Sequence, residues 1–194
     1  MDHQKSADRA ASFLDICFDT FCEYGLENTG LKRLAEACGV SNGALLYYFN
    51  SKDEIVIRAT ARCMARVEDD FMRHAPSSFA DVERFLREMP YITARMHGPK
   101  YRFMYQVYAS PKYREYGKEF FKGVSLRYAH YARQLSDKLG LPVDYLQGMI
   151  YIFVRACVHY AMFEDEEYLN FQLGTIRTSL AAFMAQNGQA KPQE

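Results

Sequence analysis

The 194-residue sequence lacks the features that would direct it into or across a membrane. No stretch approaches 18 uninterrupted apolar residues, which is about the length that a membrane-spanning helix needs. The first residues, MDHQKSADR, are polar and do not contain the apolar segment of a secretory signal. We therefore expect a cytoplasmic protein without a membrane partner.

The sequence also lacks the motifs of common enzymes and metal sites. It contains no phosphate-binding glycine loop and no H-E-x-x-H, and its five histidines are scattered. The cysteines are odd in number and show no C-x-x-C spacing, so neither a disulfide framework nor a tetrahedral zinc site is expected. Reduced, mostly buried thiols are favoured, and a redox role for Cys17 or Cys22 stays open as an alternative. We expect no enzymatic activity, no cofactor and no bound metal.

Charge is balanced overall but unevenly distributed along the chain. Residues 1–60 carry six Lys/Arg against nine Asp/Glu, residues 61–140 carry fifteen against nine, and residues 141–194 carry three against six. An acidic first segment argues against DNA binding, because a DNA-binding domain is usually basic. The position of each basic residue matters more than the sum, since several lie near predicted helix starts, where they can face phosphates. These residues are Lys5, Arg9, Lys32, Arg33 and Lys52.

Most of the sequence shows the spacing of apolar residues that is typical of amphipathic helices. Apolar residues recur at intervals of three and four, and no sustained period of two occurs, so the fold class is predicted to be all-α. Ser41 is a plausible N-cap, and Ser51 with Glu54 forms a capping-box pattern. The segment 74–78 interrupts the pattern and is predicted to be the domain hinge. Helices are predicted at about 7–24, 31–38, 42–49, 51–73, 79–97, 100–109, 111–139, 143–163 and 166–187.

Two short helices around a glycine turn form the strongest local pattern, over residues 31–49. This is the arrangement of a helix-turn-helix, in which Gly39 permits a sharp turn. Leu45 and Phe49, four residues apart, are expected to anchor the second helix from behind. The front of that helix is then exposed and has the size to enter the major groove of DNA.

The run L-A-E-A-C-G-V-S-x-G-x-L-x-Y-Y-F-x-S-K-D-E, from Leu34 to Glu54, is preceded by F-C-E-Y-G-L-E-N-T-G-L. Together they resemble the TetR/AcrR family of bacterial regulators, closely over about residues 8–56. The resemblance implies a helix-turn-helix DNA-binding domain at 1–50, a connecting helix at 51–75, and a ligand-binding and dimerisation domain at 76–194.

The resemblance also implies roles for single residues. Lys32 would reach a phosphate or a base edge, and Lys52 matches a phosphate-binding lysine at a helix N-terminus. Three positions depart from the common family pattern, which suggests weaker phosphate anchoring and apolar base contacts: Asn42, Ala44 and Leu46. Without the motif, Lys32 would be taken for part of a solvated face and the tyrosines for a hydrophobic cluster. The predicted DNA-binding residues are Lys32, Asn42, Gly43, Ala44, Tyr47, Tyr48 and Lys52.

Methionine and aromatic residues beyond residue 76 suggest an apolar ligand pocket, although such stripes are also what any helical core requires. Arg155 and His159 lie four apart on an otherwise apolar helix. They are either partners in a salt bridge, across a dimer or to the acidic run 164–167, or partners for an anionic group of a ligand. The candidate pocket residues are Met89, Met96, Phe103, Met104, Tyr108, Phe121, Tyr128, Arg155 and His159.

The helices predicted at 143–163 and 166–187 are apolar over an arc too wide to be buried within one chain. A four-helix bundle with a second copy would cover them, so a homodimer is expected. A twofold dimer predicts a pseudo-palindromic operator in double-stranded DNA. The sequence thus predicts a sequence-specific transcriptional regulator, a repressor by family expectation, controlled by an unidentified small-molecule effector. The alternative is a helical dimeric interaction or ligand-binding module that does not bind an operator.

Overall fold

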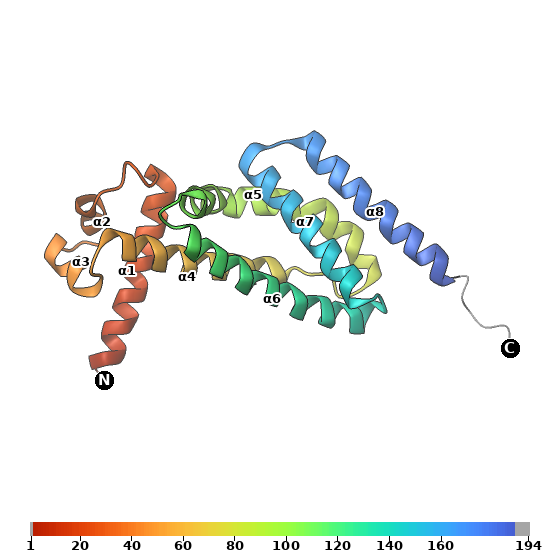
Figure 1. Cartoon of the computed structure of the whole chain (residues 1–194), viewed down its shortest axis with the longest axis horizontal. Helices are drawn as coiled ribbons and strands as arrows, with labels where there is room; N and C mark the ends of the chain where they lie inside the picture. Colours follow the sequence, from red (N-terminus) through yellow and green to blue (C-terminus); the bar gives the residue numbers. More distant parts are fainter. Residues whose placement is uncertain (1, 189–194) are drawn as a thin grey trace. The chain divides into compact units, whose positions relative to one another are not determined.

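The computed structural model describes residues 2–188, which form eight helices and no strand (Figure 1). The all-α prediction is therefore confirmed for this part of the chain. The helices are α1 (Asp2–Tyr24), α2 (Leu31–Ala37), α3 (Asn42–Tyr48), α4 (Lys52–Arg73), α5 (Phe79–Ala109), α6 (Arg114–Leu139), α7 (Val143–Phe163) and α8 (Glu166–Gly188).

One predicted interruption is wrong, because residues 79–109 form the single helix α5. Proline inside a helix removes one backbone hydrogen bond and clashes with the preceding turn, at about 3 kcal/mol or more. Pro90 and Pro99 nevertheless lie within α5, where buried side chains such as Leu86 and Met104 anchor the helix on both sides of them. Tertiary packing here outweighs the local preference on which the prediction rested.

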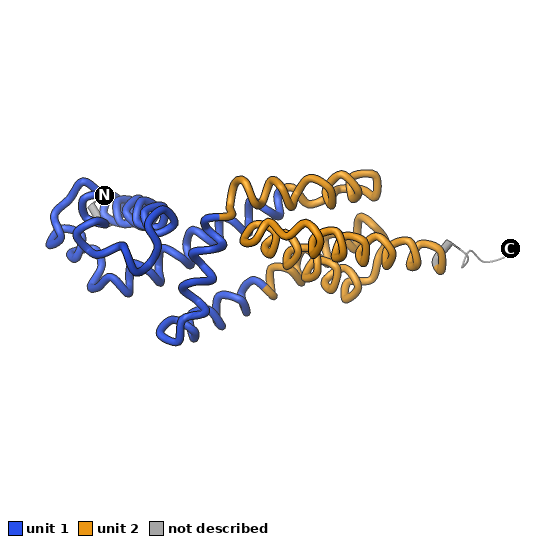
Figure 2. The backbone as a smooth tube through the Cα atoms, turned by 90° about the horizontal axis from the view of Figure 1, so that it is seen from above, with its two compact units in different colours: residues 1–73, 99–124 blue, residues 74–98, 125–194 orange. Residues whose placement is uncertain are grey.

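The chain divides into two compact units (Figure 2). Unit 1 comprises Met1–Arg73 and Pro99–Val124, and unit 2 comprises His74–Gly98 and Ser125–Glu194. The predicted helix break at Gly98 and Pro99 therefore coincides with a boundary between units inside one continuous helix. The structure groups 99–124 with the N-terminal residues, whereas the sequence-based division placed them in the C-terminal domain. The assignment of DNA binding to residues 1–50, and of ligand binding and dimerisation to residues 76–194, stays a prediction.

Unit 1 is built around α1, which packs against α2 and α4. Its core contains aromatic rings from segments far apart in the sequence. The ring of Phe103, from α5, stacks on Phe21 with centroids 5.1 Å apart and meets Phe18 edge-on at 5.6 Å. Asp53, at the start of α4, accepts hydrogen bonds of 2.6 Å from both Lys112 and Tyr113. These contacts explain why residues 99–124 belong to unit 1.

Unit 2 contains α7 and α8, which lie side by side, together with the first part of α5 and most of α6 (Figures 1 and 2). Phe85 of α5 packs on Phe153 of α7, with ring centroids 4.9 Å apart. Arg177 of α8 holds the carboxylate of Glu83 through Nε and Nη2 at 2.8–3.2 Å. A cluster of buried apolar side chains joins the end of α6 to the start of α7: Ala132, Leu135, Leu141 and Leu146.

Candidate nucleic-acid interface and ligand cavity

The turn between α2 and α3 is closed by backbone hydrogen bonds around a left-handed glycine. Gly39 has a φ of +67°, a conformation that residues with a Cβ rarely adopt. Its N–H donates to the carbonyl of Glu36, and the N–H of Val40 donates to the carbonyl of Ala35, both at 3.0 Å. This pair of bonds is the Schellman motif that ends many helices. The sharp turn predicted at Gly39 is present.

Ser41 begins the second helix of the motif, α3, and orients it. The hydroxyl of Ser41 accepts a hydrogen bond of 3.1 Å from the N–H of Ala44, which confirms the predicted N-cap. Leu45 and Phe49 are fully buried on the inner face. A short helix of seven residues has little stability of its own. The cap and these two buried side chains therefore hold α3 in place.

The opposite face of α3 is exposed, as a recognition helix requires. The side chain of Tyr47 is 82% exposed, while Tyr48 is half-buried with its ring edge-on to Phe13 at 5.3 Å. At Gly43, the nearest atom to an added Cβ would be the Ser41 hydroxyl, at an ordinary 4.0 Å. Nothing in the fold of the chain requires glycine there. The exposed residues of α3 are Asn42, Gly43, Ala44, Leu46 and Tyr47.

The N-terminus of α4 lies directly after α3 and carries the predicted phosphate-binding lysine. Ser51 accepts a hydrogen bond of 3.1 Å from the N–H of Glu54, as the capping box predicts. The carboxylate of Glu54 reaches back to the N–H of Asn50, at 3.0 Å, rather than to that of Ser51. Lys52 Nζ donates to the carbonyl of Leu26 at 2.9 Å. Lys52 therefore ties α4 to the loop before α2, and an ammonium group with three donors retains capacity for a phosphate.

The two basic residues of α2, Lys32 and Arg33, differ in how firmly other groups of the protein hold their side chains. Lys32 is strongly exposed and, among the described residues, makes a long ion pair of 3.9 Å with Glu36, one turn further on. The guanidinium of Arg33 lies over the ring of Tyr24, at 4.3 Å from its centroid, and donates to the carbonyl of Asn28 at 3.0 Å. Arg33 is thus held by Tyr24 and Asn28, whereas the ammonium group of Lys32 is open to solvent.

The acidic character of residues 1–60 is offset within unit 1. Residues 99–124 contribute six Lys/Arg against two Asp/Glu, so unit 1 as a whole has fifteen basic and fourteen acidic residues. Several of its carboxylates are also engaged. Hydrogen bonds from Lys112 and then Tyr113 lower the pKa of Asp53, and those from Arg58 and Asn50 lower the pKa of Glu54. The net negative charge of residues 1–60 is therefore a much weaker argument against DNA binding once the whole folded unit is considered.

The residues predicted to line a ligand pocket do not form one group. Phe103, Met104 and Tyr108 are buried in unit 1, and Phe121 is partly exposed there. Burial raises the pKa of Tyr108 to about 12, so its hydroxyl stays protonated. In unit 2, Met89 and Tyr128 are buried, whereas Met96 and Arg155 are exposed, as are parts of His159.

His159 interacts with the acidic run, which is one of the two alternatives left open by the sequence. Its Nε2 lies 3.2 Å from a carboxylate oxygen of Asp165, and its ring lies against Tyr168 with centroids 4.1 Å apart. The Asp165 carboxylate also accepts the N–H of Tyr168, and these bonds lower its pKa. Next to this pair, the hydroxyls of Tyr91 and Tyr160 both donate to Glu166, at 3.1 and 3.0 Å.

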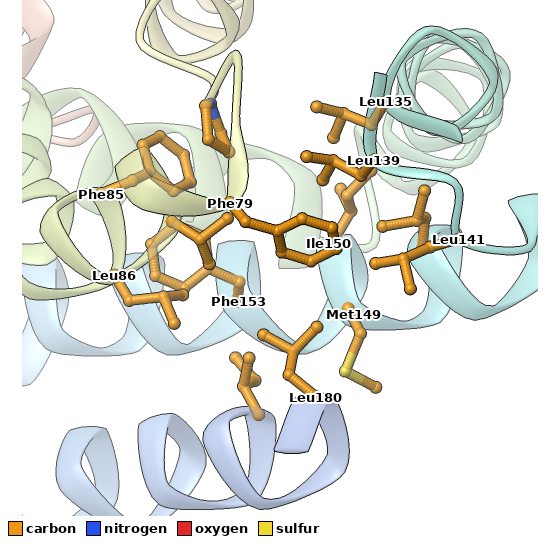
Figure 3. Close-up of a pocket in the computed structure, with 14 residues that line it drawn as sticks. Phe79, Phe85, Leu86, Leu135, Leu139, Leu141, Met149, Ile150, Phe153 and Leu180 are labelled. Carbon is orange, nitrogen blue, oxygen red and sulfur yellow. The ribbon is translucent and has the colours of Figure 1, made fainter. Parts of the chain in front are cut away.

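Unit 2 contains an apolar cavity of about 80 Å³ at the end of α6 and the start of α7 (Figure 3). Its volume suits a few methyl or methylene groups, whereas sites for drug-sized molecules measure about 300–1,000 Å³. None of the nine residues predicted to line a pocket borders it. Its side chains come from α5 to α8, from the segment before α5 and from the loop between α6 and α7: Pro76, Phe79, Val82, Phe85, Leu86, Leu135, Leu139, Leu141, Leu146, Met149, Ile150, Phe153, Ile176 and Leu180.

Arg127 of α6 is a candidate ligand contact that sequence reasoning missed. Its Nε and Nη2 atoms are buried, and no group of the described residues accepts a hydrogen bond from them. The same pair of nitrogens in Arg177 binds both oxygens of Glu83. Thr93 Oγ1, on α5 in the same unit, is also buried without a partner among the described residues. A lone arginine in a helix of mixed charge has no sequence signal that marks it as unpaired.

The helices α7 and α8 expose large apolar side chains. Phe163 and Phe171 are 66% and 71% exposed, and an added Cβ at Gly148 or Gly174 would meet no atom within 4 Å. Within the described residues, α7 is the helix whose length and composition would suit a membrane span, although it also carries Arg155 and packs along α8. Packing within unit 2 therefore leaves part of the apolar surface of α7 exposed.

Comparison with known proteins connects this geometry to a family. Residues 14–59 match the sequence model of the bacterial regulatory proteins, tetR family. The HTH-type transcriptional regulator RutR of Escherichia coli strain K12 is 44% identical over 46 residues, which are 24% of this chain and 22% of that protein. The chain thus matches less than a quarter of this curated relative. Residues 14–59, which match the family model, comprise the second half of α1, all of α2 and α3, and the start of α4.

Solved structures extend the likeness to most of the chain. A TetR transcription regulator from Haloarcula marismortui has a TM-score of 0.64 at 16% identity, covering 91% of this chain and 98% of its own. The multidrug binding protein EbrR, complexed with malachite green, has a TM-score of 0.55 at 12% identity, covering 88% and 96%. Identities this low show a shared fold alone.

Proposed function

We propose a function for this chain from the premise that it belongs to the TetR family of bacterial regulatory proteins, whose DNA-binding segment it carries at residues 14–59. The chain is a cytoplasmic transcriptional regulator that binds a specific operator sequence in double-stranded DNA. The observation that carries the proposal is the exposed front of α3, presented on a helix that Ser41 caps and that Leu45 and Phe49 anchor.

In this proposal α3 enters the major groove with its N-terminal residues first. Asn42 offers the amide that pairs well with adenine, while Ala44 and Leu46 offer apolar contact to thymine methyl groups. Gly43 leaves room for the helix backbone to approach the bases. Contacts to phosphates then fix the orientation without reading sequence. The phosphate contacts are assigned to Lys32, Tyr47, Tyr48 and Lys52. The side chains of Lys32 and Tyr47 are exposed, and those of Tyr48 and Lys52 are half-buried.

The regulator acts as a homodimer through α7 and α8. Four large apolar side chains on these two helices are substantially exposed in the single chain: Tyr151, Phe163, Phe171 and Met184. Gly148 and Gly174 leave space for the backbone of a second helix pair. A four-helix bundle between two copies would bury these groups. Twofold symmetry then implies an operator with two related half-sites.

An effector bound in the C-terminal domain controls operator affinity, and the chain acts as a repressor. The helices α5 and α6 each have one part in unit 2 and one part in unit 1, so a ligand that favours one arrangement of either helix can alter the DNA-binding unit. EbrR, a multidrug binding protein that shares the fold, was solved in complex with malachite green. Among the nine candidate pocket residues, buried Met89 and Tyr128 remain the best placed in unit 2.

Arg127 suggests the chemistry of that effector. A guanidinium edge buried without an acceptor is unfavourable, and a carboxylate fits its two parallel N–H groups. We expect a screen of organic carboxylates to raise the thermal unfolding temperature of the wild type. The uncharged amides of the same compounds would serve as controls, and Arg127→Gln should respond to neither set. Equal stabilisation of both proteins by a carboxylate would assign its binding to another site.

The test of operator binding is titration of the purified protein with DNA from upstream of its own gene, at several salt concentrations. Lys32→Ala is compared with Lys118→Ala, which removes an exposed lysine that likewise pairs with a glutamate on its own helix. Log affinity falls with log salt, and each phosphate contact that is removed makes this decline shallower by about 0.9. A dimer carries the Lys32→Ala substitution twice, so its slope should be shallower by about two. The control should keep the wild-type slope.

Absence of specific binding at low salt, both to that DNA and to a pool of random sequences, would contradict the operator-binding proposal. The chain would then be a helical dimeric ligand-binding or interaction module.

A further inference from the structure

Two thiols that the proposed function does not use meet where α1 packs against the helix-turn-helix. Cys17 lies on α1, and Cys38 is the residue that ends α2; their sulfur atoms are 3.7 Å apart. The other cysteines have different surroundings. Cys63 contacts Asp15 and Arg66, while Cys157 is fully buried in α7.

The two thiols differ in exposure and in acidity, as a reactive pair requires. Cys17 is fully buried, whereas Cys38 is half-buried. The hydrogen bond from the Cys17 thiol lowers the pKa of Cys38 below its ordinary value. The same hydrogen bond, together with burial, raises the pKa of Cys17. Burial also raises the pKa of Cys22 to about 12 and that of Cys63 to about 11, so Cys38 is the most acidic of the five thiols.

We propose that Cys17 and Cys38 form a reversible disulfide in response to peroxide, and that this bond switches the DNA-binding unit. The thiolate of Cys38 attacks one oxygen of hydrogen peroxide, the O–O bond breaks, and Cys38 becomes a sulfenic acid as hydroxide leaves. The sulfur of Cys17 then attacks that of Cys38 and expels its hydroxyl group, which leaves as water with the thiol proton. Two thiols lose two electrons, and peroxide is reduced to two molecules of water. A dithiol reverses the bond by exchange.

The bond would displace the backbone that orients the recognition helix. A disulfide is about 2.05 Å long, so the sulfur atoms must approach by more than about 1.5 Å from 3.7 Å. Cys17 is held in the aromatic core of α1, so Cys38 moves. Cys38 directly precedes Gly39, and the hydrogen bonds of the turn come from the N–H groups of residues 38, 39 and 40. A shift here is transmitted to Ser41 and the front of α3.

Disulfide formation itself depends only on the geometry of the thiols, whereas its effect on DNA rests on the proposed function. The purified full-length protein is treated with hydrogen peroxide, digested without reduction, and analysed by mass spectrometry. We expect a peptide pair that joins Cys17 to Cys38 and that has lost two hydrogen atoms. Because Cys22 shares a tryptic peptide with Cys17, the experiment is repeated with Cys22→Ser, which should retain the linked pair.

Operator affinity is measured on the same samples. We expect oxidation to lower it about tenfold or more, comparable to the effect of one mismatched base pair, and dithiothreitol to restore it. Cys38→Ser replaces the thiol at this half-buried position with a hydroxyl of similar size, so it should bind DNA normally and lose its sensitivity to peroxide. Cys63→Ser is the matched control and should respond as the wild type does.

The outcomes separate this inference from the proposed function. A linked pair in a protein that never binds DNA would leave the thiol chemistry intact and remove its regulatory role together with the proposed function. Specific DNA binding by a protein whose peroxide treatment links no pair, or links Cys22 or Cys63 instead, would overturn the inference alone. Persistence of peroxide sensitivity in Cys38→Ser would overturn it as well.

Discussion

Replacing Gly43 with alanine is expected to stabilise the protein and weaken its binding to DNA. The Cβ of alanine would have the Ser41 hydroxyl as its nearest neighbour, at 4.0 Å, so the protein accommodates it without rearrangement. Alanine in place of glycine within a helix stabilises by about 0.5–1 kcal/mol, and a position in the first turn of a short helix lies at the lower end. For a chain of this length, that corresponds to a rise of about 1–2 °C in the unfolding temperature.

The effect on binding has the opposite sign because the added methyl group lies on the exposed face of α3. If the helix backbone approaches the base edges at Gly43, the methyl group occupies that space. Disruption of the fit to one base pair typically costs about 1–3 kcal/mol, and a symmetric dimer would incur that cost in both half-sites. We therefore expect operator affinity to fall by at least about tenfold while thermal stability rises slightly.

Thermal unfolding followed by circular dichroism and fluorescence anisotropy on labelled operator DNA measure the two quantities on one preparation. Gly123→Ala is the matched control, since an added Cβ there also meets no atom within 4 Å, and Gly123 lies in the middle of α6. It should stabilise the protein and leave operator affinity unchanged. Wild-type affinity in Gly43→Ala would refute the reasoning, because it would show that DNA does not approach this backbone.

Three further changes test other parts of the structure. Gly117→Ala should destabilise unit 1 by about 1–3 kcal/mol in urea unfolding, because its Cβ would lie 2.8 Å from the Cβ of Tyr108; an unchanged midpoint would show that α6 can move aside. Asp53→Asn should lower stability at neutral pH by weakening the hydrogen bond from Lys112. Folding lowers the pKa of Asp53, so its contribution to the free energy of unfolding is fully present above pH 3.8, the ordinary pKa. This contribution is lost as the pH falls through the lowered pKa, so the unfolding curves of the variant and the wild type should converge in acid. Phe171→Glu, at a side chain 71% exposed in the single chain, should shift the protein to monomers in sedimentation experiments without unfolding it; a persistent dimer would place the interface elsewhere.

The helix-turn-helix could be predicted from the sequence because its determinants are local. The hydrogen bond from the Ala44 N–H to Ser41 and that from the Glu54 N–H to Ser51 each join residues three apart. Gly39 takes its left-handed conformation within a turn of three residues. Leu45 and Phe49 are buried at a spacing of four. Each of these patterns is visible within a few residues of sequence.

The ligand site could not be predicted in the same way. Residue type and helical spacing point to nine candidates, and the structure distributes them over two units, with none at the apolar cavity of unit 2. Spacing shows which residues share a helix face but not which other helix covers that face. Arg127 differs from Arg177 only in its surroundings, and no pattern within α6 shows that its guanidinium edge is enclosed.

The sequence by itself therefore determined the helical class, the turn, the caps and the exposed front of α3, because these follow from interactions within one or two turns of helix. The tertiary structure alone decided that α5 is one helix through two prolines, and that residues 99–124 pack with the N-terminal unit. It also brought the sulfurs of Cys17 and Cys38 to within 3.7 Å. These features depend on side chains 21 to more than 80 positions apart, such as Phe21 and Phe103, whose meeting is settled by the packing of the whole core rather than by any local preference.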